Sequence, residues 1–192
     1  MSWHFFQAFL TNWRHTGAVL PSSPVLARAI AEMAGVDQAQ HVLELGPGTG
    51  PFTKEIARVI SPEARYLGLE LNPVFVDRLR REFPQLHFEC TPSQSYDFDQ
   101  FLHPGQDFDS IVSGLPWTAF PHDLQVDILE HALSRLRPGG RLVTFAYAGF
   151  HLLPAGQHFA QLLKSRCADL QRSAIIWPNM PPAFLYAAVK AD

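Results

Sequence analysis

Residues 42–50 have the sequence Val42-Leu43-Glu44-Leu45-Gly46-Pro47-Gly48-Thr49-Gly50, an apolar run followed by three glycines at alternate positions. The next segment, 51–60, has apolar residues at helical spacing. A glycine backbone can approach a ligand where a Cβ would collide with it. The stretch therefore predicts a strand, a ligand-binding loop and a helix. A plain strand–turn–helix corner is the simpler alternative.

The segments around this loop alternate between strand and helix patterns. Strands are expected at 41–45, 65–70, 86–90, 109–113 and 141–147, and helices at 24–33, 51–60, 73–83 and 121–136. Pro138-Gly139-Gly140 is expected to form the turn that leads into the fifth strand. Strands that are separated by helices predict a mostly parallel sheet with helices on both faces.

The C-terminal part predicts a helix at 158–165 and two closing strands at 173–177 and 184–189. The connection between these strands is too short for a parallel crossover, so they should run antiparallel. The expected fold is therefore α/β, with a mostly parallel seven-stranded sheet and an antiparallel C-terminal hairpin. A chain of 192 residues suits one domain, expected at 17–192 after an amphipathic N-terminal helix at 1–16.

Composition narrows the function. A formal net charge of −3 does not favour nucleic acid as a partner, because such proteins usually present a clustered positive face. Cys90 and Cys167 lack metal-ligand spacing, so no metal site and a reducing cytosol are expected, with Cys90 as a buried thiol. The sequence contains no apolar run of the roughly 18 residues that a membrane-spanning helix needs.

The glycine spacing distinguishes two kinds of nucleotide site. Dinucleotide folds use G-x-G-x-x-G, with a pyrophosphate at the helix N-terminus. Here the third glycine comes one residue earlier and an acid precedes the loop. This E-x-G-x-G-x-G form resembles the first motif of class I methyltransferases, which are Rossmann-like and use S-adenosylmethionine. The resemblance implies that the amino-acid end of the cofactor is held by Glu44, Gly46, Pro47, Gly48, Thr49 and Gly50.

Two further strand ends fit the same cofactor. Glu70 ends the second predicted strand, 20 residues after Gly50, where an acidic side chain can accept both ribose hydroxyls. Leu71 follows it directly. The third strand leads into Pro92 and Ser93. In the family an acidic residue or a polar turn contacts adenine at this point, and this chain has the turn without the acid.

The fourth strand ends in Ser113-Gly114-Leu115-Pro116-Trp117. This stretch resembles the Asn/Asp-Pro-Pro-Tyr and Asn-Leu-Pro-Tyr motifs of amino-group methyltransferases, with serine in place of the longer acceptor. The resemblance implies that Ser113 and the backbone of Gly114 and Leu115 orient the acceptor nitrogen. Trp117 and Tyr147 would wall the site and attract the cationic product. Both aromatics are equally compatible with core packing.

A primary amine is mostly protonated near pH 7, because its reference pKa is about 10. Something must therefore take up a proton before transfer, or the site must select the neutral amine. The candidates are His122, Tyr147 and Tyr186. No arginine is singled out by the sequence as a partner for a lipid phosphate.

Three more segments narrow the resemblance: 17–23, Phe120-Pro121 and 179–183. Together with 44–50 they are similar to bacterial phospholipid N-methyltransferases, which convert phosphatidylethanolamine stepwise towards phosphatidylcholine. The cofactor would be S-adenosylmethionine, released as S-adenosylhomocysteine. Related enzymes methylate ornithine lipids. Ribosomal RNA adenine dimethyltransferases share the fold but normally carry an extra helical domain, for which this length leaves no room.

The N-terminal residues suit a lipid substrate. On a helix, one face would be formed by Trp3, Phe5, Phe6, Phe9, Leu10 and Trp13. Such a face can lie in a bilayer interface. In the resembling family a similar helix binds anionic membrane and covers the cofactor. Arg14 is the single formal cation of the polar side, so apolar insertion would dominate. Packing against the core is the alternative.

The expected activity is N-methylation of the amine headgroup of a membrane lipid, phosphatidylethanolamine or its methylated intermediates. The enzyme would be cytoplasmic and peripheral at the inner face of the cytoplasmic membrane. The alternatives are an ornithine lipid, an RNA adenine, a protein or a small amine as acceptor. A non-catalytic lipid- or cofactor-binding module is a further alternative, because a fold alone does not establish activity.

Overall fold

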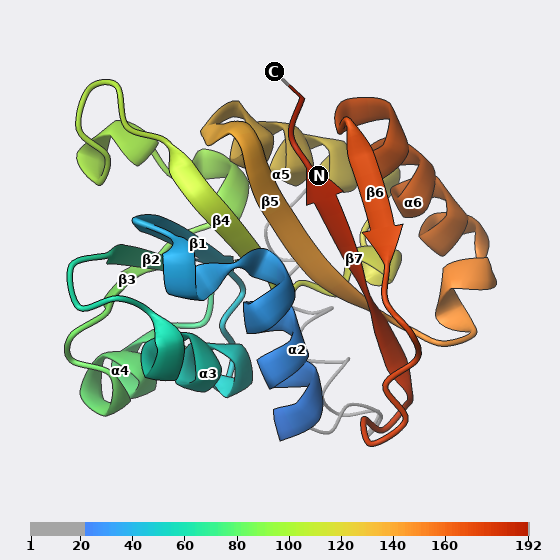
Figure 1. Ribbon diagram of the computed structural model, residues 1–192, viewed down its shortest axis with the longest axis horizontal. Helices are drawn as coiled ribbons and strands as arrows, with labels where there is room; N and C mark the ends of the chain where they lie inside the picture. The colour runs from blue at the N-terminus through green and yellow to red at the C-terminus, as the bar shows by residue number, and fades with distance from the viewer. Residues whose placement is uncertain (1–21, 192) are drawn as a thin grey trace.

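The computed structural model describes residues 22–191, which form one seven-stranded sheet (Figure 1). The expected N-terminal helix at 1–16 lies outside these residues. The sheet has the order β3-β2-β1-β4-β5-β7-β6. Its strands are β1 (His41–Leu45), β2 (Arg65–Glu70), β3 (His87–Cys90), β4 (Phe108–Ser113), β5 (Leu136–Tyr147), β6 (Asp169–Arg172) and β7 (Ala183–Val189).

Neighbouring strands from β3 to β5 are parallel, whereas β7 runs antiparallel to both β5 and β6. The helices cover both faces of the sheet (Figure 1). They are α2 (Pro24–Ala34), α3 (Pro51–Val59) and α4 (Pro73–Glu82) on one face, and α5 (His122–Ser134) and α6 (Pro154–Arg166) on the other. The expected α/β architecture with an antiparallel C-terminal hairpin is confirmed.

Local signals set the helix boundaries. The side chain of Ser23 accepts a hydrogen bond from the Leu26 amide at the start of α2, and Pro24 takes the first helical position. The helix ends at Gly35, whose φ of 67° lies in the left-handed region that favours glycine. Asn72 caps α4 in the same way as Ser23 caps α2, through the Val74 amide.

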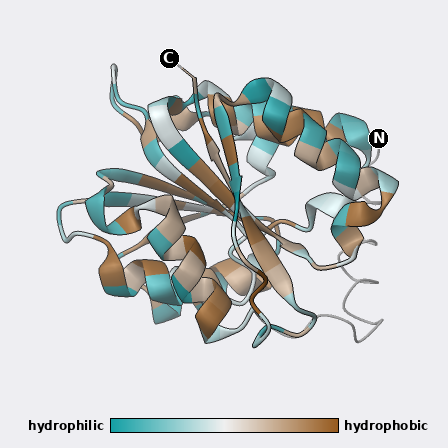
Figure 2. Ribbon diagram, turned by 45° about the vertical axis from the view of Figure 1, so that its right-hand side comes forward, coloured by the Kyte–Doolittle hydropathy of each residue, from teal (hydrophilic) through white to brown (hydrophobic). Residues whose placement is uncertain are grey.

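Two apolar clusters sandwich the sheet. Leu43 and Leu45 of β1 face α5 and α6, whereas Val42 faces α2 and α3. Figure 2 shows the apolar strands enclosed between helices whose outer surfaces are more hydrophilic. Because side chains alternate along a strand, this arrangement also fixes where polar residues at the strand ends point. Glu44 is directed toward α3 and Ser113 toward α5.

The structure corrects two boundaries in the C-terminal half. Pro138-Gly139-Gly140 lies inside β5 rather than in a turn before it: Phe108 pairs with Leu136 and Ser110 with Arg141, so the residues between form a bulge. The penultimate strand is β6 (Asp169–Arg172). Residues 173–177 form no regular strand, although Ser173 hydrogen-bonds to Leu185 of β7 and Ile176 forms an isolated bridge with Ala183. The polar residues of β6 suit an exposed edge strand, which gives no apolar pattern.

Cys90 is exposed, contrary to the expected buried thiol, because β3 forms the outer edge of the sheet. The helix expected at 158–165 is longer and begins at Pro154. Within residues 22–191, none of the helices has the length and apolar character required to cross a bilayer.

Candidate active site

The carboxyl ends of β1, β2 and β4 meet at one edge of the sheet, and the glycine loop lies there. Gly46, Gly48 and Gly50 have φ values of 67°, 60° and 86°. These left-handed conformations explain why glycine occupies alternate positions. A Cβ on Gly48 would have no neighbouring heavy atom closer than 4.0 Å, so this part of the loop is open to a ligand.

The loop packs tightly against the end of β4. The Gly46 amide donates to Leu69 O at 2.9 Å and the Gly114 amide to Leu45 O at 2.8 Å. A Cβ on Gly114 would lie 2.6 Å from the carbonyl oxygen of Gly46, so a larger residue cannot fit without movement of the backbone. The loop that would hold a cofactor and the turn that would hold an acceptor are therefore in direct contact.

Glu70 lies at the centre of this edge and is 7% exposed. Its Oε2 accepts from the Gly48 amide, and its Oε1 accepts from the amides of Leu71 and Asn72, each at 2.8 Å. The carboxylate thus links the glycine loop to the end of β2. Its position matches the one that the sequence assigns to the ribose acceptor.

Leu71, Pro92 and Ser93 lie beside Glu70. Glu70 pairs with Cys90 in the sheet, so the turns after β2 and β3 are neighbours. Ser93 begins the short 3-10 helix η2 (Ser93–Ser95), and the Cys90 thiol lies 3.7 Å from Leu71 O as a donor. The structure therefore brings the residues expected around adenine to the same end of the sheet as the glycine loop.

Glu44 lies behind the loop rather than on its open side. Its carboxyl group is fully buried, and Oε2 accepts from Tyr66 Oη at 2.6 Å and Thr53 Oγ1 at 2.9 Å. Within residues 22–191, Oε1 has no hydrogen-bond partner. Burial, as the main cause, raises the pKa of Glu44 to about 7. These contacts join β1, β2 and α3, and the expected contact of Glu44 with the cofactor stays a prediction.

Ser113 is also directed into the interior. Its Oγ accepts from the indole Nε1 of Trp117 at 3.0 Å and from the Leu115 amide at 3.3 Å. Thr144 Oγ1 accepts from the same indole at 3.1 Å and donates to Ser113 O at 3.0 Å. These three side chains are buried. The hydroxyl thus holds Trp117 in place, and its expected role in orienting a substrate nitrogen stays a prediction.

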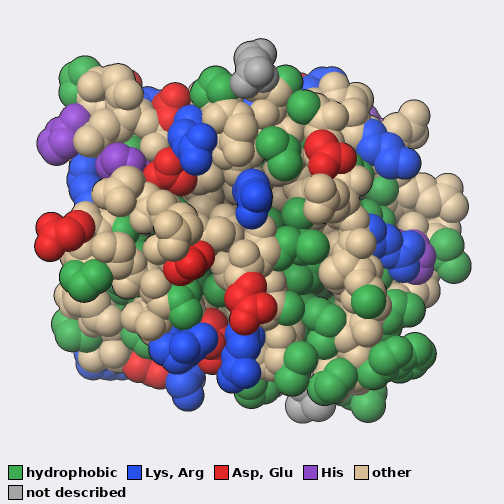
Figure 3. Space-filling model, viewed as in Figure 1, with side chains coloured by type: hydrophobic (Ala, Val, Ile, Leu, Met, Phe, Trp, Pro, Cys, Tyr) green, Lys and Arg blue, Asp and Glu red, His purple; other side chains and the backbone are tan. Residues whose placement is uncertain are grey.

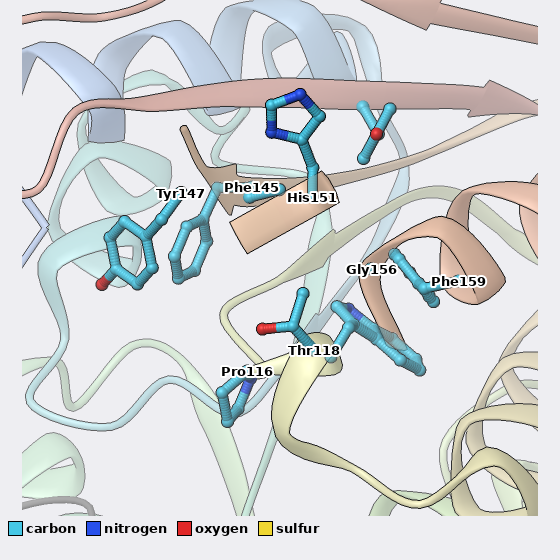
Figure 4. A pocket seen from close by; sticks show the side chains of 10 residues that line it. Pro116, Thr118, Phe145, Tyr147, His151, Gly156 and Phe159 are labelled. Atoms are coloured by element: carbon cyan, nitrogen blue, oxygen red, sulfur yellow. The ribbon is translucent and has the colours of Figure 1, made fainter. Parts of the chain in front are cut away.

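A pocket opens next to this turn, between the end of β5 and the 3-10 helix η4 (Trp117–Ala119) (Figure 4). Figure 4 shows Phe145 and Tyr147 extending from β5 toward the turn that carries Pro116 and Thr118. The pocket is mostly aromatic and apolar. Its lining residues are Pro116, Trp117, Thr118, Phe145, Ala146, Tyr147, His151, Gly156, Phe159 and Tyr186.

Trp117 forms one wall of the pocket and is itself 2% exposed. Its ring stacks on Phe159 with centroids 4.5 Å apart and an interplanar angle of 16°. Tyr147 meets Phe145 edge to face at 5.2 Å. Trp117 and Tyr147, which the sequence places at strand ends, therefore line one pocket. Such a set of rings can attract an ammonium group through cation–π interactions of about 0.5–2 kcal/mol.

The three residues considered as proton acceptors differ in position. Burial raises the pKa of Tyr147 to about 12, and burial also raises the pKa of Tyr186. Neither phenol is suited to accept a proton near neutral pH. His122 does not line the pocket. Its ring centroid lies 3.7 Å from that of His158, between α5 and α6.

His151 lines the pocket and was missed from the sequence. It belongs to η5 (Phe150–Leu152), a 3-10 segment of three residues that has no periodicity to detect. Its position four residues after the expected Tyr147 site was the one available signal. Its Nδ1 lies 3.3 Å from the amide nitrogen of Gly149, and its ring meets Phe184 edge to face at 4.9 Å.

The sequence is similar to those of known methyltransferases. A family model described as a methyltransferase domain matches residues 42–140. An ornithine lipid N-methyltransferase of Singulisphaera acidiphila is 31% identical over 183 residues, covering 83% of this chain and 95% of that protein. Ribosomal RNA small subunit methyltransferase A of Chlorobium phaeobacteroides is 27% identical over 81 residues, covering 42% of this chain and 30% of that protein.

Among solved structures, an O-methyltransferase from Bacillus cereus in complex with S-adenosylhomocysteine has a TM-score of 0.69. It is 15% identical, and the match covers 99% of this chain and 92% of that one, so it supports the fold. The family match takes in the glycine loop, Glu70 and the turn at 113–117, whose geometry suits a cofactor with a ribose and an amino-acid end. The chain belongs to the class I methyltransferases, enzymes that use S-adenosylmethionine as methyl donor.

Proposed function

We propose that this enzyme transfers methyl groups from S-adenosylmethionine to the amine nitrogen of a membrane lipid headgroup. The observation that carries this proposal is the 31% identity to an ornithine lipid N-methyltransferase along almost the full length of that relative. The aromatic pocket beside the glycine loop supports it, because methylation of an amine produces a cation that aromatic rings attract. An ornithine lipid and phosphatidylethanolamine are the two headgroups to be tested.

We assign the cofactor to the edge formed by β1, β2 and β3. The backbone of 46–50 holds its amino-acid end, Glu70 accepts from the ribose hydroxyls, and Leu71, Pro92 and Ser93 flank the adenine. Glu44 acts behind the loop as a positioning residue through Thr53 and Tyr66. When bound, S-adenosylmethionine supplies a methyl group on a sulfonium sulfur, which is open to attack by a neutral amine.

The acceptor would enter the pocket from the side of Thr118 and His151. Within the turn, Leu115 O accepts from the Trp117 amide and Pro116 O from the Ala119 amide, whereas Gly114 O has no donor among residues 22–191. We assign to the Gly114 carbonyl the role of accepting a hydrogen bond from the amine, which would aim the nitrogen lone pair at the methyl group. A nitrogen–carbon bond forms as the carbon–sulfur bond breaks.

Each transfer to a primary or secondary amine also requires the loss of one proton from nitrogen. We assign His151 as the residue that receives it, because it lines the pocket and histidine is the side chain that most often acts as a general base. The two tyrosines of the pocket keep their protons under these conditions. Their rings form part of the pocket wall instead.

The test is labelled methyl transfer from S-adenosylmethionine into vesicles that contain either an ornithine lipid or phosphatidylethanolamine, with the products separated. Label in one lipid identifies the headgroup, and the separated products give the number of methyl groups added. If neither lipid is labelled although the cofactor binds, the acceptor is a different amine. An RNA adenine would then be tested first, because the shorter match is to an RNA-modifying enzyme.

Under the same proposal the enzyme is a peripheral membrane protein, bound at the inner face of the cytoplasmic membrane. The residues expected to contact the bilayer, Trp3 to Trp13, lie outside the described part of the chain.

A further inference from the structure

We propose that Arg172 binds the anionic group of the lipid headgroup while the amine occupies the aromatic pocket. The inference rests on the proposed lipid substrate and adds a residue that selects it. Phosphatidylethanolamine carries a phosphate and an ornithine lipid a carboxylate, so the shared ligand is an oxyanion a short distance from an amine.

The position of Arg172 is fixed by the sheet. It is the last residue of β6 and pairs with Tyr186 of β7, so the two side chains leave the sheet on the same face. Tyr186 lines the pocket. Arg172 is therefore the cross-strand neighbour of a residue that lines the pocket.

Phe184 connects this cation to the pocket. The Cζ of Arg172 lies 3.8 Å from the centroid of the Phe184 ring, a cation–π contact. The rings of His151 and Tyr186, both of which line the pocket, meet the same phenyl group edge to face at 4.9 and 5.0 Å. The guanidinium is thus oriented by a ring that packs against two residues of the pocket lining, which reduces the side-chain freedom lost on binding.

Arg172 also has unused binding capacity. Arg135, Arg137 and Arg166 each form an ion pair with an acidic side chain. In the part of the chain from 22 to 191, no carboxylate lies within ion-pair distance of Arg172, which is exposed. Its charge nevertheless reaches the pocket, because it lowers the pKa of the Tyr186 hydroxyl while burial raises it. A guanidinium in this state can bind a phosphate or a carboxylate with two parallel hydrogen bonds.

This arrangement would make the enzyme selective for zwitterionic headgroups. A lipid with an amine and no oxyanion would enter the aromatic pocket but lose the contact with Arg172. Because the contact is made in the ground state as well as during transfer, its loss should raise KM more than it lowers kcat.

The experiment compares the wild type with Arg172→Gln, Arg172→Lys and a control, Arg81→Gln. Arg81 is exposed on α4, on the opposite face of the sheet, and has no ion pair among the described residues. Its replacement changes the net charge by the same amount. Each protein is assayed in uncharged detergent micelles, which removes general attraction to a charged surface.

Four substrates separate the two sources of the oxyanion. They are an ornithine lipid, its carboxyl methyl ester, a short-chain phosphatidylethanolamine, and the same lipid with its phosphate methylated to a neutral triester. For the wild type, neutralising the oxyanion of the true substrate should raise KM about tenfold or more. Arg172→Gln should show that higher KM with the charged lipid and no further rise with the neutral one.

Arg172→Lys keeps the charge but lacks the planar guanidinium that forms two parallel hydrogen bonds, so its KM should be intermediate. The KM of Arg81→Gln should match that of the wild type. An unchanged KM in Arg172→Gln, with the wild-type preference for the charged lipid intact, would overturn the role of Arg172 and leave the proposed function standing. If the wild type methylates none of the four lipids, the proposed function and this inference both fail.

Discussion

The carboxyl group of Glu44 is buried with two hydroxyl donors and, within residues 22–191, without an ion-pair partner. Burial favours the neutral acid and raises its pKa from 4.5 to about 7. The folded protein therefore binds this proton more tightly than the unfolded chain. The resulting stabilisation is complete below about pH 4.5 and is lost as the pH rises through about 7.

We predict that Glu44→Gln weakens this pH dependence. Between pH 4.5 and 8 the free energy of unfolding of the wild type should fall by about 3 kcal/mol more than that of the variant, from a pKa change of roughly 2.5 units. Urea unfolding at a series of pH values measures the difference. Glu63→Gln, an exposed control, should follow the wild type. Parallel curves for the wild type and Glu44→Gln would contradict the prediction.

Tyr147 gives a second prediction at this scale. Because burial raises its pKa to about 12, its hydroxyl should not act as the base, and its ring should supply the wall. Tyr147→Phe is expected to keep the pH profile of kcat and to lose far less than the roughly 100-fold that removal of a general base costs. Tyr147→Ala should lose considerably more, because the ring is gone. A shifted pH profile in Tyr147→Phe would show that the hydroxyl takes part in proton transfer.

Individual residues were predictable from the sequence where backbone conformation decided their role. Gly46, Gly48 and Gly50 have left-handed φ values that glycine accommodates. The position of Glu70 at the end of β2 follows from the length of that strand. The surroundings of Glu44 and Ser113 were not predictable. Glu44 meets Tyr66 across 22 residues, and Trp117 meets Thr144 across 27, so these contacts depend on the assembled sheet.

At the scale of elements, the contact between the glycine loop and the end of β4 joins the two halves of the site. We predict that Gly114→Ala both destabilises the fold and weakens cofactor binding, because its Cβ would lie 2.6 Å from the backbone oxygen of Gly46. Overpacking of this kind typically costs about 1–3 kcal/mol. Thermal unfolding measures the first effect, and calorimetry with S-adenosylmethionine measures the second. Wild-type values for both would refute the close contact.

Most elements could be predicted because β1 to β4 and their helices have regular apolar patterns between glycine and proline boundaries. The predicted elements are wrong where the local amino-acid composition suggests one structure and the strand pairing imposes another. Pro138-Gly139-Gly140 has the composition of a turn, yet the pairing of β5 with β4 on both sides of it turns these residues into a bulge. β6 is polar and exposed, so its pairing with β7 leaves no pattern in the sequence.

At the scale of the whole molecule, the pocket lies close to a surface rich in apolar side chains. Exposed members are Phe150, Leu152, Leu153, Trp177 and Met180, on η5 and on the connection between β6 and β7. Figure 3 shows hydrophobic side chains gathered at the lower right, where that connection lies in Figure 1. The first residues of the described part of the chain are held at this surface, because the Ser23 amide donates a hydrogen bond to Asn179 Oδ1 at 2.9 Å.

We predict that removal of residues 1–16 weakens binding to vesicles and leaves the domain folded. The expected aromatic face would be lost, whereas the members of both apolar clusters within the described residues come from 26–188. Sedimentation with anionic vesicles measures the partition, and circular dichroism checks the fold. Equal partition of both forms would show that the first residues do not provide the membrane contact. A loss of the folded signal would show that they stabilise the domain.

The place of β7 also bears on how the protein is made. β7 lies between β5 and β6, although it is the last strand in the chain. On the ribosome, β5 and β6 emerge before the strand that joins them, and β6 pairs with no other strand of the described sheet. Because translation proceeds at roughly 5–20 residues per second, the edge of β5 stays unpaired for several seconds. Unpaired edges can capture another chain. Slow translation through 173–189 would therefore prolong the interval in which nascent chains can aggregate.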